Sequence, residues 1–128
     1  MARVLVVEDN VSNMTLATFL LKSAGHTVLS ATDAEKGLTI ARAEQPELIL
    51  MDIQLPGMDG LEATALLKGD VTTRAIPVIA LTALAMKGDE ERIRAAGCDG
   101  YIAKPLAYRE FLATVGMFLL PSPPPQAR

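Results

Sequence analysis

Unbroken apolar runs that stop at acidic residues are the clearest pattern along this chain. Residues 48–51 are four large apolar residues in a row, and they are followed by Asp52 and a stretch rich in turn formers. Residues 4–7 repeat the pattern and run into Glu8 and Asp9. Short continuous apolar runs bounded in this way are typical of strands buried on both faces. We therefore expect two central strands that each end in carboxylates.

Weaker patterns predict three further strands and five helices. The strands are expected at residues 27–31, 78–81 and 101–103. Between them, apolar residues at helical spacing and helix start and stop signals predict one helix after each strand. The helices are expected from a cap at Asn10 or Ser12 to Gly25, from a capping box over residues 32–35 to before Pro46, from Asp59 to Gly69, over residues 84–96, and through residues 111–119.

Strands and helices that alternate along a chain predict an α/β fold. Strands in such an order form a parallel sheet through right-handed crossovers, with helices on both faces, which is a doubly wound sheet. The chain contains no internal repeat and no linker, so we expect one domain over residues 1–120. Residues 121–128 are rich in proline and are expected to form a disordered tail.

Composition narrows the class of protein. The chain has 128 residues, of which 50% are hydrophobic and 21% charged, and its net charge is −3. These values fit a globular domain and argue against a basic nucleic-acid-binding surface. No apolar run approaches the ~20 residues of a membrane span, and the amino end does not resemble a signal peptide. With one cysteine (Cys98) and one histidine (His26), neither an internal disulfide nor a zinc site is available within the chain. We expect a cytoplasmic protein.

Reactive residues stand at four predicted strand ends. The first strand ends at Glu8 and Asp9, the third at Asp52, the fourth at Thr82, and Lys104 follows the fifth. In a doubly wound sheet these ends meet at one edge, where ligands bind. Carboxylates crowded together repel each other unless a cation lies among them, and Mg²⁺ prefers such oxygen ligands. The sequence therefore predicts a magnesium site.

The same residues suit phosphoryl transfer. An aspartate can act as a nucleophile and form an acyl phosphate, and the reaction needs positive charge around the phosphoryl oxygens. Lys104 and Mg²⁺ would supply that charge, and Thr82 would donate a hydrogen bond. We therefore identify Asp52 as the candidate phosphoacceptor.

The order of these motifs resembles the receiver domain of two-component response regulators. The resemblance consists of an acidic pair, an Asp, a Thr and a Lys-Pro pair at strand ends, and it covers residues 2 to about 119. Residues 51–60 resemble the phosphoacceptor stretch of the family. Residues 82–92 are similar both to single-domain regulators and to receivers attached to hybrid kinases. The resemblance implies a flavodoxin-like, five-stranded sheet of order 2-1-3-4-5.

The resemblance also implies a role for each residue of the site. Asp52 would accept a phosphoryl group from a histidine of a sensor histidine kinase or a phosphotransfer protein. Asp9 and Asp52 would bind Mg²⁺ together with the backbone carbonyl of Gln54. Glu8 stands where many members have aspartate, and it would act through a metal-bound water. Lys104 would pair with the phosphoryl group.

Further implied roles concern the response to phosphorylation. Thr82 and Tyr101 would be a switch pair, in which the hydroxyl moves toward the phosphate and the ring follows inward. The bond between Lys104 and Pro105 is expected to be cis. A downstream protein would bind the surface formed by residues 84–96, Tyr101 and the last helix. The kinase is expected to dock on a surface near the acceptor that comprises Asn13, Met14, Ala17 and Pro105.

Three alternatives remain open. The first is a magnesium-dependent phosphatase with an aspartyl-phosphate intermediate, but Gln54 stands where such enzymes often have an acid/base aspartate. The second is a receiver-like interaction module that is never phosphorylated, although Asp52, Thr82 and Lys104 are all present. The third is a flavin or nucleotide binder, which the anionic segment of residues 8–13 disfavours. We expect a protein that catalyses only its own phosphorylation and dephosphorylation and is not otherwise an enzyme.

Overall fold

The computed structural model describes residues 2–83 and 87–119, which form a five-stranded parallel sheet with helices on both faces. The strand order is β2-β1-β3-β4-β5, as expected. The strands are β1 (Arg3–Val7), β2 (Thr27–Ala31), β3 (Leu48–Asp52), β4 (Val78–Thr82) and β5 (Gly100–Ala103). The helices are α1 (Val11–Ser23), α2 (Ala34–Glu44), α3 (Gly60–Gly69), α4 (Lys87–Ala95) and α5 (Tyr108–Leu119).

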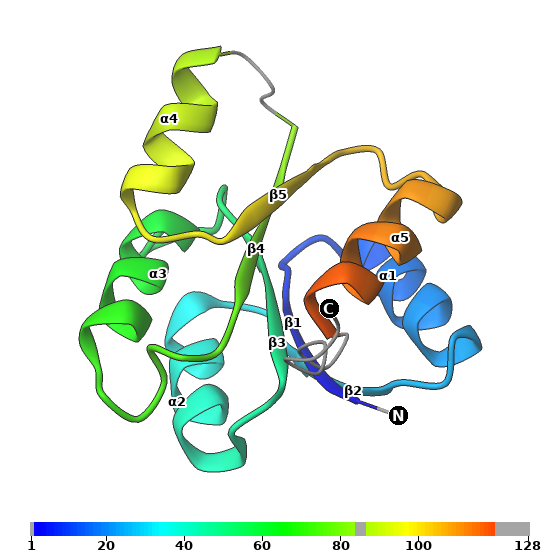
Figure 1. Cartoon of the computed structure of the whole chain (residues 1–128), viewed down its shortest axis with the longest axis horizontal. Coiled ribbons are helices and arrows are strands. Elements are labelled where there is room, and N and C mark those ends of the chain that lie inside the picture. Colours follow the sequence, from blue (N-terminus) through cyan, green and yellow to red (C-terminus); the bar gives the residue numbers. More distant parts are fainter. Residues whose placement is uncertain (1, 84–86, 120–128) are drawn as a thin grey trace, which may run out of the picture.

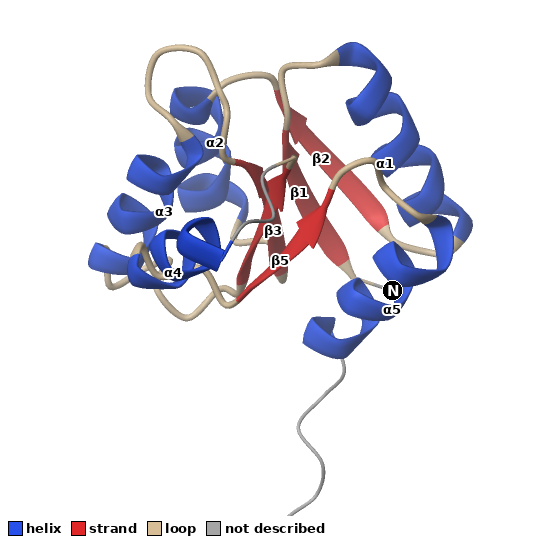
Figure 2. Cartoon of the chain, turned by 90° about the horizontal axis from the view of Figure 1, so that it is seen from above, coloured by secondary structure: helices blue, strands red, loops and turns tan. Residues whose placement is uncertain are grey.

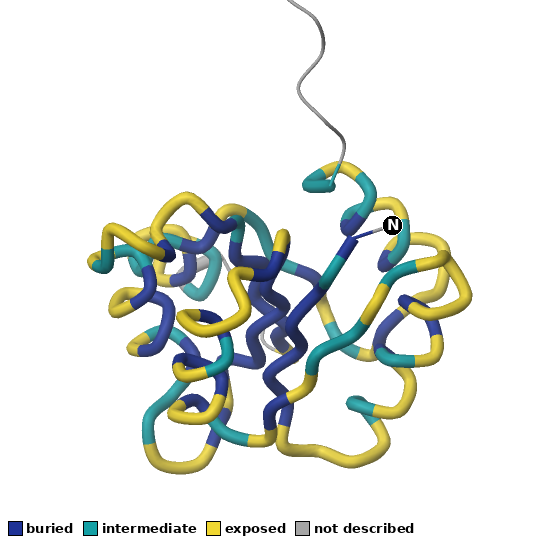
Figure 3. Tube along the Cα trace, turned by 90° about the horizontal axis from the view of Figure 1, so that it is seen from below, coloured by how far each residue is buried: buried dark blue, intermediate teal, exposed yellow. Residues whose placement is uncertain are grey.

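The helices form two layers around the sheet. Helices α1 and α5 cover one face, and α2, α3 and α4 cover the other (Figures 1 and 2). Each face has its own hydrophobic cluster, because successive side chains of a strand point to opposite faces. The residues of β3 and β4 are all buried, and the buried trace in Figure 3 is concentrated in the middle of the sheet. The unbroken apolar runs of the sequence therefore form strands that helices cover on both faces.

Side-chain caps fix where the helices begin. The side chain of Asn10 accepts a hydrogen bond from the backbone N–H of Asn13 at 2.9 Å, so Asn10 and not Ser12 caps α1. Asp59 and Glu62 form the capping box that starts α3. The capping box expected at residues 32–35 is wrong, because Asp33 is the cap of α2 and accepts from Lys36. Asp33 is one residue after Thr32, and its side chain can bond the free N–H groups at the start of the helix, which therefore begins at Ala34.

Two predicted segments lie outside the described residues. They are residues 84–86, the start of the predicted fourth helix, and the proline-rich tail from residue 121 onward. Within the described residues, no helix has both the length and the apolar character needed to cross a membrane.

Gly60 brings the start of α3 against the end of β3. A Cβ atom at Gly60 would meet the backbone carbonyl oxygen of Asp52 and would lie 2.7 Å from the Cα atom of Ile53. The backbone N–H of Gly60 donates to the carbonyl of Ile53 at 3.3 Å. The missing side chain therefore lets α3 pack directly on the backbone of Asp52.

Replacing Gly60 by alanine should destabilise the fold. Because the colliding atoms belong to the backbone, the helix or the strand end has to move, which typically costs about 1–3 kcal/mol. Gly69→Ala is the matched control, since no atom lies within 4 Å of its added Cβ. Urea unfolding should show a lower free energy of unfolding for Gly60→Ala and little change for Gly69→Ala. Equal stabilities of the two variants would contradict this view of the contact.

Candidate functional site

The register of the parallel strands brings the predicted residues to one edge. Val7 of β1 pairs with Met51 of β3, so Glu8, which follows β1, lies beside Asp52, the last residue of β3. On the other side, Asp52 pairs with Leu81 of β4, next to Thr82. The backbone N–H of Lys104 donates to the carbonyl of Thr82 at 2.8 Å. The convergence expected from the sequence is therefore present.

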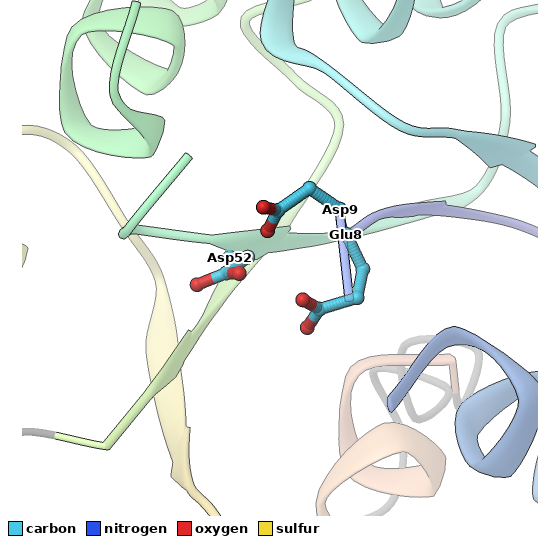
Figure 4. A group of neighbouring side chains, drawn as sticks. All are labelled: Glu8, Asp9 and Asp52. Carbon is cyan, nitrogen blue, oxygen red and sulfur yellow. The ribbon is translucent and has the colours of Figure 1, made fainter. Parts of the chain in front are cut away.

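Three carboxylates gather at this edge. Glu8, Asp9 and Asp52 each offer an oxygen, and these oxygens all lie within 4.8 Å of one another. Figure 4 shows Glu8 and Asp9 at the end of β1 and Asp52 at the end of β3, with their carboxylates turned toward a shared space. Glu8 and Asp52 are 1% and 2% exposed, whereas Asp9 is exposed to solvent. The cluster is thus buried at its base and open to solvent on the side of Asp9.

Lys104 provides the positive charge of the cluster. Its ammonium group lies 3.0 Å from Oε1 of Glu8 and 3.2 Å from Oδ2 of Asp52. The lysine side chain is itself largely buried. One cation therefore bridges the two buried carboxylates, and Asp9 adds a further negative charge nearby.

Backbone N–H groups hold the other oxygens of the two buried acids. Oδ1 of Asp52 accepts from the N–H of Gln54 at 3.0 Å, and Oε2 of Glu8 accepts from the N–H of Asn10 at 3.1 Å. Oε1 of Glu8 accepts no well-directed hydrogen bond from the described residues, so its contact with Lys104 is mainly ionic. These bonds orient both carboxylates.

Burial and neighbouring charges shift the pKa values of Glu8 and Lys104. The pKa of Glu8 is raised above its ordinary value of 4.5, chiefly by burial and then by the neighbouring Asp52, although Lys104 opposes the shift. Burial alone would lower the pKa of Lys104, but Glu8 and Asp52 outweigh it and raise the pKa. Lys104 therefore stays charged at neutral pH. Its single positive charge does not balance the negative charge of the three carboxylates.

The donor set fits a magnesium ion. It consists of carboxylate oxygens from Glu8, Asp9 and Asp52, which are the hard ligands that Mg²⁺ prefers. Oε1 of Glu8 is buried and lacks a directed hydrogen bond, and the exposed Asp9 gives a hydrated cation access to the cluster from solvent. The predicted use of the Gln54 carbonyl as a ligand stays a prediction.

The two predicted switch residues stand on neighbouring strands. Thr82 is fully buried at the end of β4. Tyr101 on β5 is half-buried, and its hydroxyl donates to Oε2 of Glu90 on α4 at 3.0 Å. This bond raises the pKa of Tyr101. Sequence analysis missed Glu90, because Glu90 and Tyr101 lie on different elements, and the spacing of residues within one helix or strand does not predict a contact between two elements.

The predicted kinase-docking surface needs a correction at Ala17. Ala17 is 1% exposed and packs in the core, so its side chain cannot contact a partner. Met14 is half-buried against the same core cluster, whereas Pro105 is exposed and its bond to Lys104 is cis, as expected. Sequence analysis missed the exposed apolar residues of α1, because a helical stripe does not say which neighbouring residues the core leaves uncovered; they are Val11, Leu16 and Phe19.

Comparison with known protein families identifies the family of the chain. The model of the response regulator receiver domain matches residues 4–116 of the chain. The chain belongs to this family. The resemblance of its strand-end motifs to receiver domains is thereby confirmed, and the chain is part of two-component signalling.

Relatives and solved structures agree with this assignment. The chain is 49% identical to the polar-differentiation response regulators DivK of Brucella anthropi and Brucella ovis over 116 residues, which are 91% of this chain and 94% of each relative. The chemotaxis protein CheY4 of Vibrio cholerae matches with a TM-score of 0.88 and 27% identity, covering 93% of this chain and 99% of that protein.

One structural neighbour bears on the metal. The receiver domain of the sensor histidine kinase PA1611 from Pseudomonas aeruginosa PAO1 matches with a TM-score of 0.85 and 35% identity over 91% of this chain and 96% of that domain. In that structure a magnesium ion is coordinated in the active-site cleft. This neighbour and the acidic cluster of Glu8, Asp9 and Asp52 agree on the kind of ion that the site fits.

Removing the ammonium group of Lys104 should destabilise this receiver domain. Lys104→Met leaves Glu8 and Asp52 buried without their cation, and breaking a buried ion pair on one side typically costs about 3–5 kcal/mol. Urea unfolding at neutral pH in the presence of a chelator should show this loss. Lys22→Met, at an exposed lysine in the last turn of α1, is the control and should change stability little.

The loss should depend on pH. The pKa of Glu8 is higher in the folded than in the unfolded state. Its ionised form therefore destabilises the fold, and this effect disappears once the pH is low enough to protonate the carboxyl in both states. The deficit of Lys104→Met should therefore shrink as the pH falls from neutral toward 4.5, the ordinary pKa of Glu8. A deficit that is constant over this range would show that the lysine stabilises the fold by packing alone.

Proposed function

We propose that this receiver domain accepts a phosphoryl group on Asp52 from a phosphohistidine of a sensor histidine kinase or a phosphotransfer protein. The contact between Lys104 and Asp52, in a cluster that opens to solvent at Asp9, carries the proposal. A carboxylate oxygen of Asp52 forms a bond to phosphorus while the bond from phosphorus to the histidine nitrogen breaks. The histidine keeps the electron pair and later takes up a proton.

The residues around Asp52 prepare it for this reaction. The hydrogen bond from the Gln54 N–H orients the carboxylate, and Lys104 stands where it can neutralise the oxygens of an incoming phosphoryl group. Asp9, Asp52 and the carbonyl of Gln54 would hold Mg²⁺, with Glu8 acting through water. When bound, the ion supplies positive charge for the phosphoryl oxygens and screens the carboxylates from one another.

Phosphorylation would then shift a conformational equilibrium. The hydroxyl of Thr82 turns toward the phosphoryl group, and the ring of Tyr101 follows inward. The new contacts of Thr82 and Lys104 favour this arrangement, so the phosphoryl group changes the population of states that the domain samples. The changed surface comprises α4, Tyr101 and α5, and it would bind a downstream protein.

The donor protein would dock beside the acceptor. Asn13, Met14 and Pro105 remain part of this proposed surface, and the exposed apolar residues of α1 replace Ala17. Val11 and Phe19 are 79% and 66% exposed, and they line an open apolar hollow with Leu16. Apolar side chains rimmed by polar residues are typical of protein-binding surfaces.

An enzyme that hydrolyses outside phosphate esters is the weaker candidate. Such a phosphatase needs an acid/base group near the nucleophile, and the exposed Gln54 cannot transfer protons. The domain would catalyse only its own phosphorylation and dephosphorylation. Turnover of an added phosphate ester would revive the alternative. A cytoplasmic location, where sensor kinases present their phosphohistidine, is part of the proposal.

Incubation with acetyl phosphate and Mg²⁺ should add one phosphoryl group to the protein. Intact-mass measurement should show this gain in the wild type and no gain in Asp52→Asn, which lacks the nucleophilic carboxylate. Asp9→Asn and the omission of Mg²⁺ should each slow the reaction by about a hundredfold or more, since several kcal/mol of charge stabilisation are lost.

The control is Asp33→Asn, which removes a carboxylate outside the cluster. Asparagine caps helices as well as aspartate does, so the start of α2 is retained. This variant should be phosphorylated like the wild type. Phosphorylation of Asp52→Asn at the wild-type rate would place the acceptor elsewhere.

Beryllofluoride, which mimics the phosphoryl group on aspartate, should move the ring of Tyr101. Nuclear magnetic resonance of ¹³C-labelled tyrosine rings follows this movement, and Tyr108→Phe leaves Tyr101 as the only tyrosine of the chain. With Mg²⁺ and beryllofluoride the Tyr101 signals should shift, and in Asp52→Asn they should not. Unchanged signals in a protein that demonstrably binds beryllofluoride would remove Tyr101 from the switch.

A further inference from the structure

The hydroxyl of Tyr101 is held by a charged partner on α4. It donates to Oε2 of Glu90 at 3.0 Å, and Oε1 of the same carboxylate lies 3.8 Å from Nε of Arg94, one helical turn further along. Hydrogen bonds to an ionised acceptor are stronger than those between neutral groups. Both oxygens of Glu90 are thus engaged, one with β5 and one with its own helix.

The helix that carries Glu90 is anchored beside β5. Ile93, one turn after Glu90, is 1% exposed and packs in the same hydrophobic cluster against which the ring of Tyr101 lies. Figure 1 shows α4 next to β5, at the sheet edge away from β2. The bond from Tyr101 to Glu90 therefore joins two elements that are already in contact, and it fixes the orientation of the ring relative to α4.

An inward movement of the ring has to break this bond. The hydroxyl of Tyr101 is on the end of a rigid ring, so the ring cannot turn away from α4 while the hydroxyl stays 3.0 Å from Glu90. A contact made in only one of two conformations stabilises that conformation and opposes the other by its whole free energy. Glu90 is therefore placed to set the equilibrium of the switch without touching the phosphoacceptor.

We propose that Glu90 is a positioning residue that holds Tyr101 in the unphosphorylated orientation, so that its hydrogen bond opposes the switch. The proposal rests on the proposed function, in which Tyr101 turns inward. It identifies a residue outside the phosphoacceptor cluster that sets how readily this domain responds. The charge of Glu90 strengthens the contact, and Arg94 keeps the carboxylate in position.

Beryllofluoride titration of Glu90 variants tests the proposal. Glu90→Ala removes the acceptor and retains the helix, because alanine is the best helix former. Its half-saturating concentration of beryllofluoride with Mg²⁺ should be about fivefold lower than that of the wild type. Glu90→Gln keeps an uncharged acceptor and should give an intermediate value. Glu91→Ala, which removes the same charge from an exposed neighbouring position, should match the wild type.

A second measurement separates this role from simple packing. Without beryllofluoride, the Tyr101 ring signals of Glu90→Ala should already lie closer to those of the bound wild-type protein. In a Tyr101→Phe background the hydroxyl is absent, so Glu90→Ala should not change the half-saturating concentration further. An effect of equal size in that background would show that Glu90 acts by another route and would overturn the proposal.

The outcomes also distinguish this proposal from the proposed function. If the wild type does not bind beryllofluoride, the proposed function fails and the role of Glu90 fails with it. If the wild type binds and its Tyr101 ring moves, but Glu90→Ala behaves like Glu91→Ala, only the role of Glu90 is overturned.

Discussion

The pairing of one buried ammonium group with two buried carboxylates is the interaction on which the structure of the site depends. Lys104 lies within 3.2 Å of both Glu8 and Asp52, which are almost inaccessible to solvent. Burying charged groups is costly unless they are paired and hydrogen-bonded. Here Asp9 adds a third carboxylate, so three acids face one lysine. The site therefore has an excess of negative charge, which a bound divalent cation would reduce.

The fold makes this arrangement possible because it fixes the positions of the charges. Parallel strands place their carboxyl ends at one edge, and buried strands such as β3 and β4 cannot shift to relieve the repulsion without disturbing both hydrophobic clusters. Gly60 adds a second constraint, since α3 packs directly on the backbone of Asp52. A carboxylate held in this way is oriented before any reaction partner arrives.

Much of the fold and the site follows from the sequence, because both depend on patterns that are local. Four-residue apolar runs predicted the central strands, and acids at their ends predicted the cluster. Where several residues fit the same local pattern, the sequence did not decide between them. The cap of α2 was placed at residue 32 instead of Asp33, since two neighbouring residues can both bond the first N–H groups.

Ala17 and Glu90 show why the remainder could not be predicted. The helical spacing of apolar residues gives the buried stripe of a helix but not its edges, so Ala17 was assigned to a docking surface although it lies in the core. Glu90 meets Tyr101 only because α4 packs beside β5. A polar contact between elements has no period in the sequence, and it becomes visible only when both elements are placed.

A backbone hydrogen bond between the ends of β4 and β5 links the two helical layers at the site. Lys104 leads from β5 toward α5, which belongs to one layer, whereas Thr82 leads from β4 toward α4, which belongs to the other. The hydrogen bond from the Lys104 N–H to the Thr82 carbonyl joins the residue that follows β5 to the last residue of β4. If Asp52 is phosphorylated as proposed, its charge would change beside both Lys104 and the end of β4. Because protein interiors are closely packed and do not deform continuously, such a change would favour a discrete rearrangement over a gradual one.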